Sequence, residues 1–314
     1  MKNKHLEHIE DHILEGKRGA INAINFLDTK QSQVSVKYDG APAIVYGTNP
    51  ENGKFFVGTK SVFNKKRIKI NYTHTDIESN HGHIPRVASI LHICLDRLPQ
   101  NDGIYQGDFI GYGGDDLYKP NTLLYLFPDK IKHKIIIAPH TEYVCTGSSL
   151  LDTHALPLET PLYSTYDGVL FMQCDCVGKF QDNVRDRVQF AKQIATMVEY
   201  VNNKKAQELK KTFNHCIRLG QRFTEENIIR IANEHNVDVN LMRLWKLVRS
   251  IKLDALAMCE NNAWWKSFDS IDECDGEGYV MWNKWGIYKL VDRDEFSRLN
   301  FLTTGDWTPK KLSQ

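Results

Sequence analysis

Strand-like and helix-like patterns follow one another in an order that limits the folds open to this chain. Short apolar or alternating runs of the strand type recur between residues 34 and 172. Helical periodicity then occupies residues 184–258, with breaks near Gly220 and Asn236, and two further strand-like runs follow at 279–282 and 286–291. A late pair of strands needs partners, so we expect it to return to the first sheet. The order predicts an α+β fold with antiparallel sheets and a helical insertion.

The expected domain division follows from this order. A chain of 314 residues, 41% hydrophobic and 25% charged, has the composition of an ordinary globular protein, which excludes disorder as its main state. We expect one sheet domain made of residues 1–175 and 270–314, and a helical, basic lobe made of residues 176–269. Within the sheet domain, residues 5–15 and 87–98 show the apolar spacing of amphipathic helices.

Hydropathy and cysteine usage indicate the compartment. No run approaches the roughly 18 apolar residues of a membrane span, and the N-terminal stretch is polar. The seven cysteines are scattered, with Cys174 and Cys176 as the one close pair, which excludes a disulfide framework and a pair of CxxC knuckles. We expect a monomeric cytoplasmic protein without a membrane partner, acting in the host cytoplasm if it is viral.

Positive charge is concentrated in the helical block. The whole chain carries a net charge of +1, whereas residues 179–252 contain fifteen Lys and Arg against eight Asp and Glu, a formal charge of +7. This concentration fits a surface for a phosphate backbone, and it equally fits solvated helix faces. A second basic patch lies after the hairpin that we predict for residues 43–57, with its turn at residues 49–53. The cations that we predict to contact nucleic acid are Lys65, Lys66, Arg67, Arg185, Arg187, Lys204, Lys205, Lys210 and Lys211.

The segment Lys37-Tyr38-Asp39-Gly40 carries the first sign of chemistry. It lies between two strand-like runs, where a lysine can project from a sheet. A neutral lysine amine is a nucleophile, and neighbouring cations or desolvation lower the pKa of an amine enough to make it available. The alternative interpretation is a strand-ending turn in which Gly40 takes a positive φ.

Further segments strengthen this sign because of their order and residue types. Each contains a charged residue at the end or edge of a strand-like run. They are Gly58-Thr59-Lys60-Ser61, Gln106-Gly107-Asp108-Phe109, Glu277-Gly278-Tyr279-Val280 and Tyr288-Lys289-Leu290-Val291. The set resembles the covalent nucleotidyltransferase superfamily, the ATP-dependent DNA and RNA ligases and mRNA capping enzymes.

Within that superfamily the chain looks most like bacteriophage RNA ligases. The Glu-Gly-Tyr-Val element, the Lys60-Ser61 pair and a chain after Val291 too short for an OB fold carry this likeness. The first 150 residues also look like a family of poorly characterised phage proteins. The resemblance covers residues 34–171 and 275–300, and it implies a nucleotidyltransferase, or adenylation, domain of the ligase type without an OB domain.

The resemblance implies a role for each matching residue. Lys37 is expected to attack the α-phosphate of ATP and form a lysyl-AMP intermediate, in a loop shaped by Asp39 and Gly40. Lys60 is expected to contact the ribose or phosphates, and Lys289 to neutralise the charge that develops on the α-phosphate.

Two acidic residues complete the expected site. Glu277 is expected to hold Mg²⁺ or Mn²⁺ near the α-phosphate. Asp108 takes a place usually held by a glutamate, facing the ribose or a metal-bound water. The cofactors implied are therefore ATP and a divalent cation.

The function expected from this set is an ATP-dependent RNA ligase, a nucleotidyltransferase suited to RNA repair. Its three steps are adenylation of Lys37, transfer of AMP to a 5′-phosphate end, and attack by a 3′-hydroxyl that releases AMP. A DNA ligase and a GTP-using capping enzyme are alternatives. So is a non-catalytic nucleotide- or nucleic-acid-binding protein on a decayed ligase fold, because Val291 stands where the family usually has a second lysine and Asp108 is one methylene short.

Several residues are candidates for functions that the family pattern leaves open here. Arg293 and Lys284 are candidates to replace the missing lysine. Candidates for stacking on adenine or on bases are Phe127, Tyr143, Phe171, Trp264 and Trp265, and general principles favour a hydrophobic packing role over stacking for each.

Overall fold

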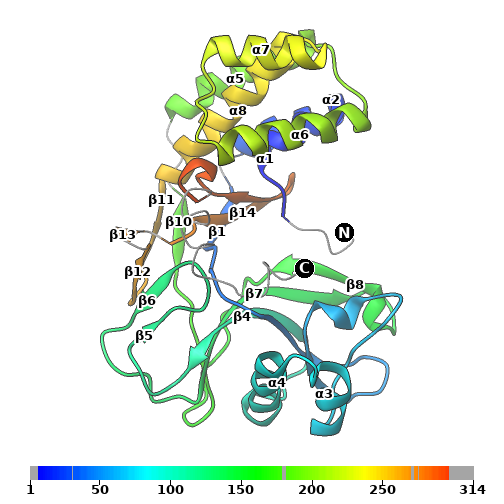
Figure 1. Ribbon diagram of the computed structural model, residues 1–314, viewed down its shortest axis with the longest axis vertical. Coiled ribbons are helices and arrows are strands. Elements are labelled where there is room, and N and C mark those ends of the chain that lie inside the picture. The colour runs from blue at the N-terminus through cyan, green and yellow to red at the C-terminus, as the bar shows by residue number, and fades with distance from the viewer. Residues whose placement is uncertain (1–5, 30, 179–181, 270–271, 275, 297–314) are drawn as a thin grey trace. The chain divides into compact units, whose positions relative to one another are not determined.

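A computed structural model of the protein describes residues 6–29, 31–178, 182–269, 272–274 and 276–296. It is a mixed α+β structure with antiparallel sheets, as the order of patterns predicts. The chain divides into two compact units (Figure 1). Among the described residues, unit 1 contains 38–174 and 263–276, whereas unit 2 contains 6–37, 175–262 and 277–296.

Unit 1 is built around a six-stranded sheet. Five strands follow the spatial order β3-β2-β4-β7-β8 with antiparallel neighbours, and β9 pairs in parallel with β7. The strands are β2 (Ala43–Thr48), β3 (Phe55–Gly58), β4 (Ile104–Tyr112), β7 (Ile135–Cys145), β8 (Thr153–Pro157) and β9 (Val169–Phe171). The hairpin expected between residues 43 and 57 is the β2–β3 pair.

Both faces of this sheet are covered, because successive side chains of β2 point to opposite sides. Ile44 and Tyr46 lie in the core beneath α3 (His74–His81) and α4 (Pro85–Arg97). Val45 lies in the core on the other side, with Val62 from the 3-10 helix η1 (Lys60–Phe63) and Leu150 from η2 (Leu150–Asp152). The apolar spacing over residues 87–98 thus predicted α4 correctly, and Pro85 occupies a first-turn position that suits proline.

A second, four-stranded sheet of unit 1 joins segments far apart in the sequence. Its spatial order is β13-β12-β6-β5. The strands are β5 (Leu117–Tyr118), β6 (Leu124–Leu126), β12 (Lys266–Phe268) and β13 (Glu273–Cys274). Trp265, directly before β12, is buried and its ring lies near the rings of Tyr38 and Phe127.

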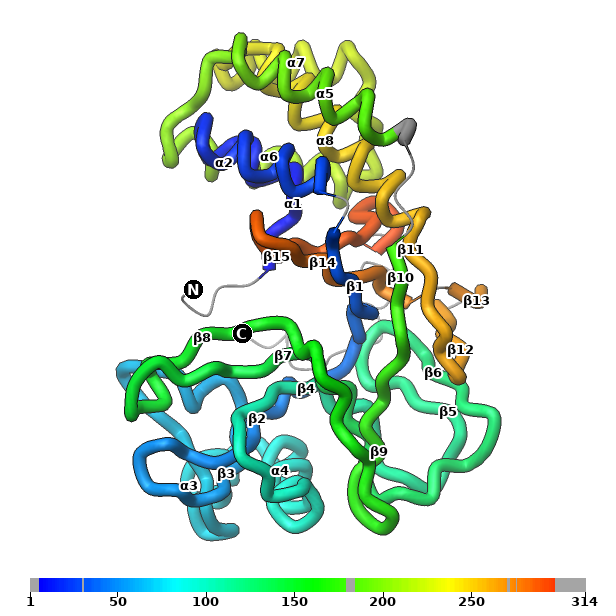
Figure 2. Tube along the Cα trace, turned by 180° about the vertical axis from the view of Figure 1, so that it is seen from behind, coloured from blue at the N-terminus to red at the C-terminus, as the bar shows by residue number. Residues whose placement is uncertain are grey.

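The helices of unit 2 include the whole basic block. Of the helix expected over residues 5–15, the described part of the chain forms only the short helix Ile9–His12, and the next helix begins at Gly16, which has a positive φ. The helices are α1 (Ile9–His12), α2 (Gly16–Leu27), α5 (Asp182–Met197), α6 (Asn203–Arg218), α7 (Glu225–His235) and α8 (Val239–Ala257). Figure 2 shows all six from behind. None of the helices in the described part of the chain combines the length and apolar composition needed to cross a membrane.

The remaining strands of unit 2 form two small sheets. A three-stranded antiparallel sheet has the order β1-β14-β15, and β10 pairs with β11. The strands are β1 (Gln33–Val36), β10 (Cys176–Gly178), β11 (Cys259–Asn261), β14 (Tyr279–Asn283) and β15 (Gly286–Leu290). The late strands therefore pair with β1 and not with the β2–β3 hairpin.

This pairing also explains why the units differ from the expected domains. The contacts of β1 with β14, and of α2 with α5, bind the N-terminal segment and residues 277–296 to the helical block. The block is therefore part of a unit with its own small sheet. The expected division, a sheet domain interrupted by a separate helical lobe, groups these segments differently and stays a prediction.

Candidate active site

Lys37 comes directly after β1, and the backbone hydrogen bonding between the two segments continues for one bond beyond the β1–β14 pair. Its backbone N–H donates to the carbonyl oxygen of Gly278, at 2.8 Å. The same pairing brings the side chain of Lys37 to that of Glu277, with Nζ 2.5 Å from Oε2. The carboxylate side chain is 9% exposed and the lysine side chain 26%. Two of the predicted site residues, from opposite ends of the sequence, are therefore in direct contact within unit 2.

Gly278 explains why glycine follows Glu277. Its φ is +122°, and a Cβ there would lie 2.3 Å from the carbonyl oxygen of Leu290. Only glycine adopts this conformation without strain and leaves room for that close approach. The glycine thus lets the start of β14 lie against the end of β15, which places Glu277 next to Lys37.

Lys289 lies on the same face of this sheet as Lys37. Val280 pairs with both Lys289 and Ser35, and Ser35 is two residues before Lys37. Because side chains alternate along a strand, these residues share one face. Burial lowers the pKa of Lys289, the neighbouring Lys37 lowers it further, and Glu277 opposes both effects. The two lysines are therefore close enough to interact electrostatically.

The opposite face of the sheet is part of the core of unit 2. Its side chains are at most 9% exposed. They are Val34, Val36, Tyr279, Met281, Tyr288 and Leu290. The sheet thus has one buried face and one face that carries the lysines and is only partly buried.

Asp39 lies in unit 1 and has a structural role there. Its side chain is buried, and its carboxylate accepts hydrogen bonds from Asn121 Nδ2 at 2.6 Å and from the backbone N–H groups of Thr122 and Leu123, each at 2.7 Å. A carboxylate that satisfies three donors fixes the loop after Lys37 to residues 121–123.

Gly40 is required by close packing and does not have a positive φ. A Cβ on Gly40 would lie 2.6 Å from Asp108 Cβ and 2.9 Å from the carbonyl oxygen of Phe109. Asp108, on β4, has its Oδ1 3.6 Å from His140 Nε2. The segment after Lys37 is therefore packed against the part of β4 that carries the predicted acid.

Lys60 begins η1, directly after β3, and its side chain is exposed. The hydroxyl oxygen of Thr59 accepts from the backbone N–H of Ser61 and caps this turn. Lys60 itself makes no hydrogen bond or ion pair with other described residues, and its nucleotide role stays a prediction.

A family of unknown function, DUF6267, matches residues 3–230 and 179–304 of the chain. The chain belongs to this family. No curated protein and no solved structure matches it.

In this DUF6267 protein Glu277 is the carboxylate that lies beside Lys37. No group of three His, Cys, Asp or Glu side chains in the described ranges is arranged to hold a metal ion. Mg²⁺ commonly uses one or two carboxylates, with substrate phosphates and waters as its other ligands. Glu277 is a carboxylate of this kind, and a metal role of Glu277 or of Asp108 stays a prediction.

The structure places the candidate stacking residues mainly in cores. Phe127 is 1% exposed, Tyr143 is 5% and Phe171 is 5%. Trp265 is buried as well, and Trp264, at 45%, is the one large ring of this set with an exposed surface. None of the three buried rings has a free face for adenine in this arrangement.

Of the two candidates for the missing lysine, Arg293 is buried and hydrogen-bonded to side chains of unit 2. It is 4% exposed, and its guanidinium donates to Glu10 and Asp11 at 3.1 and 3.0 Å, and to Asn214 at 2.5 Å. Lys284, at the β14–β15 turn, lies over the ring of Trp285, 5.7 Å from its centroid. Arg293 is therefore a structural residue of unit 2.

The cations predicted to contact nucleic acid fall into two groups. Three of the cations in the helical block form ion pairs with acidic side chains. Arg187 pairs with Asp254, and Lys205 pairs with Glu208 at 2.9 Å. Lys210, which is 8% exposed, pairs with Glu15 at 2.9 Å. The others are exposed and form no ion pair with a described residue. They are Lys65, Lys66, Arg67, Arg185, Lys204 and Lys211.

Sequence reasoning missed a buried charged cluster next to the β1-β14-β15 sheet. Lys252 Nζ lies 3.1 Å from Glu10 Oε1, both side chains are 0% exposed, and the ammonium also donates to the Val291 carbonyl at 2.8 Å. Burial raises the pKa of Glu10, but Lys252, His8 and Arg293 together lower it to about 2. We name these four side chains the buried charge cluster. Nothing in the spacing of Glu10 and Lys252 could have identified it.

His140 is a second residue that the sequence did not single out. It occupies the bulge of β7 at which the pairing with β4 shifts between Gln106 and Gly107. This position aims the ring at Asp108 and at Gln106, whose Nε2 is 3.5 Å from His140 Nε2. Bulges of this kind reorient single side chains, and their position depends on strand pairing that the sequence does not reveal.

Proposed function

We propose that this protein is an ATP-dependent RNA ligase that acts through adenylation of Lys37. The observation that carries the proposal is the contact of Lys37 with Glu277, on a sheet face that also holds Lys289. An amine, a carboxylate and a second cation at one place match the needs of nucleotidyl transfer: a nucleophile, a proton acceptor and charge stabilisation.

Each group has a defined part in the first step. The Lys37 ammonium passes a proton to Glu277, 2.5 Å away, and becomes a neutral nucleophile. Nζ then forms a bond to the α-phosphorus of ATP, the bond from that phosphorus to the bridging oxygen breaks, and pyrophosphate leaves with the electron pair. Lys289, on the same face of the sheet, stabilises negative charge on the α-phosphate.

The remaining roles rest on different grounds. Mg²⁺ or Mn²⁺ bound with the triphosphate would neutralise phosphate charge, with Glu277 as the protein ligand in unit 2. Lys60 and Asp108 belong to unit 1, and the sequence resemblance alone assigns them to ribose, phosphate or metal contacts. The packing of Asp39 and Gly40 in unit 1 supports a structural role in the loop that follows Lys37.

Labelled nucleotide tests the proposal. The protein is incubated with ATP labelled at the α-phosphate and Mg²⁺, then denatured. We expect label to stay on wild-type protein, to be released as AMP after acid treatment, and to be absent from Lys37→Ala and from the charge-conserving Lys37→Arg. Label on Lys37→Arg would contradict the assignment of the nucleophile.

Parallel reactions separate the alternatives. A protein adduct formed from GTP but not from ATP would indicate a capping enzyme, and no adduct from either nucleotide would indicate a non-catalytic binder. With ATP present, we expect circularisation of a 5′-phosphorylated single-stranded RNA to exceed sealing of nicked DNA. The reverse order would indicate a DNA ligase.

A further inference from the structure

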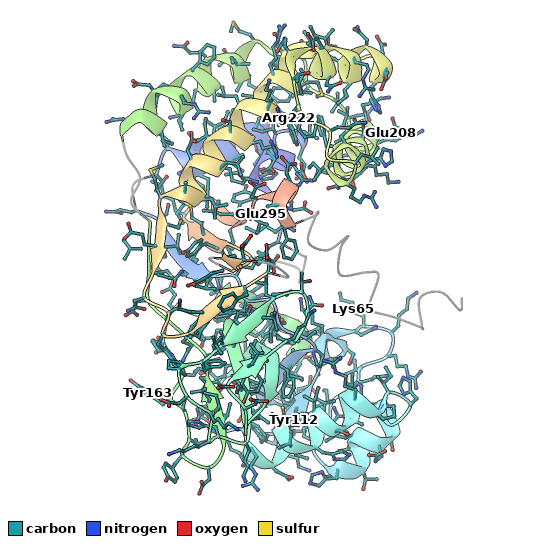
Figure 3. The ribbon with its side chains drawn as sticks, turned by 60° about the vertical axis from the view of Figure 1, so that its left-hand side comes forward. Lys65, Tyr112, Tyr163, Glu208, Arg222 and Glu295 are labelled. Atoms are coloured by element: carbon teal, nitrogen blue, oxygen red, sulfur yellow. The ribbon has the colours of Figure 1, made fainter. Side chains whose placement is uncertain are left out.

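The segment after β3 has an unusual charge. From Asn52 to Thr75 the sequence contains no acidic residue, and it contains six Lys and Arg. Five of these cations are exposed in the structure, and four of them lie after β3: Lys60, Lys65, Lys66 and Arg67. We name residues 60–69 the cationic loop. Figure 3 shows Lys65 at the surface of unit 1.

The exposed cations of this loop are not neutralised by neighbouring acids. In the part of the chain that the structure describes, none of the four forms an ion pair. The helical block differs in two ways. Acids from its own helices, from the N-terminal segment and from the segment after β15 pair with many of its cations, and its unpaired cations Arg185, Lys204 and Lys211 have an acid, Asp186 or Glu208, within four residues in the sequence. The ion pairs include Lys192–Asp28, Arg230–Glu234, Arg243–Glu225 and Arg249–Asp294.

The cationic loop is held in a defined conformation. Asn64 Oδ1 accepts from the backbone N–H groups of Lys66 and Arg67, at 2.9 and 3.3 Å. Further along, the backbone N–H of Lys69 donates to Ser61 at 3.3 Å, and the Lys69 ammonium donates to the Asn80 carbonyl at 2.6 Å. Bonds within the loop and to the end of α3 therefore fix the backbone that carries the exposed cations.

We propose that the cationic loop, and not the basic helical block, binds the phosphate backbone of the single-stranded RNA substrate. The inference deepens the proposed function and rests on it for the identity of the polyanion. Unpaired cations release counterions when they contact phosphates, which is the main source of affinity for a nucleic-acid backbone. Cations already paired with carboxylates contribute less binding free energy, because the phosphate must first displace the carboxylate. The net charge of +7 in the block is therefore a poor guide to its affinity for RNA.

Two matched triple variants test this proposal. One changes Lys65, Lys66 and Arg67 to Gln, and the other changes Arg185, Lys204 and Lys211 to Gln. Both remove three exposed, unpaired cations and alter the net charge equally. Binding of a fluorescent, 5′-phosphorylated single-stranded RNA is measured by anisotropy over a range of salt concentrations, and thermal unfolding confirms that each variant is folded.

We expect the loop variant to lose about 100-fold in affinity at 0.1 M salt, and its plot of log K against log salt to flatten by about 2, since each single-strand phosphate contact contributes a slope of about 0.7. The helical-block variant should bind like wild type. Each single loop variant should flatten the slope by about 0.7, which keeps the test valid if the triple variant is unstable.

Several results would overturn the proposal. They are a loop variant with wild-type affinity and slope, a block variant that loses as much affinity as the loop variant, or a wild-type protein that does not bind the RNA. Formation of lysyl-AMP is measured separately on the wild-type protein without RNA. Its failure would refute the proposed ligase activity, whereas the comparison of the two triple variants would still decide where RNA binds.

Discussion

Replacing Lys252 by Met tests the energetic importance of the buried charge cluster. The ammonium is 0% exposed, 3.1 Å from Glu10 Oε1 and 2.8 Å from the Val291 carbonyl. Methionine conserves most of the side-chain volume but leaves the Glu10 carboxylate with Arg293 as its remaining cation, at 3.1 Å. Removing one partner of a buried ion pair costs about 3–5 kcal/mol, because the other charge stays in a medium that solvates it poorly.

We expect Lys252→Met to lower the free energy of unfolding of unit 2 by about 3–5 kcal/mol. Urea denaturation followed by tryptophan fluorescence measures this change, since Trp245 is buried in unit 2 and its indole N–H donates to Asp11. The double variant Glu10→Gln with Lys252→Met should recover part of the loss, because no acid is then left unpaired by the missing ammonium. A single variant within about 0.5 kcal/mol of wild type would refute the reasoning. So would a double variant whose loss equals the sum of both single losses.

Three further predictions concern single side chains. Burial lowers the pKa of His8 from 6.5 to about 2. The unfolded state therefore binds an extra proton, and the free energy of unfolding should fall by about 1.4 kcal/mol per pH unit below pH 6.5. The His8→Asn variant should show a shallower decline in urea titrations at acid pH, and an unchanged slope would contradict this role of His8. Asp39→Ala removes the acceptor of three hydrogen bonds and should destabilise unit 1 by about 3 kcal/mol in urea unfolding, whereas a loss under about 0.5 kcal/mol would show that these bonds matter little. Glu277→Gln keeps the shape of the side chain but not its basicity, so lysyl-AMP formation from labelled ATP should slow by about 100-fold; an unchanged rate would exclude Glu277 as the proton acceptor.

Local patterns predicted many of the elements. The period of the apolar residues located α4, and the turn residues between Thr48 and Phe55 located the β2–β3 hairpin. The breaks expected near Gly220 and Asn236 are the ends of α6 and α7, where both residues have a positive φ. Such signals depend on interactions within a few residues, which is why the sequence reveals them.

Long-range pairing could not be predicted in the same way. The choice of β1 as the partner of β14 separates the two sheets and determines the units, and it depends on packing between distant segments. The ion pairs of the helical block depend on long-range packing as well: Lys210 and Arg187 are cationic in the sequence, and acids that are distant in the sequence fold beside them and pair with them. The contact of Lys37 with Glu277 was expected only through resemblance, since 239 residues lie between them.

The most direct test of the account is to locate the site of adenylation. Wild-type protein is incubated with ATP and Mg²⁺, digested under mildly alkaline conditions that preserve a phosphoramidate, and its peptides are analysed by mass spectrometry. The account predicts one added AMP on the peptide that contains Lys37, with fragment ions that place it on that lysine. AMP on another residue, or no modified peptide from protein that binds ATP, would contradict it.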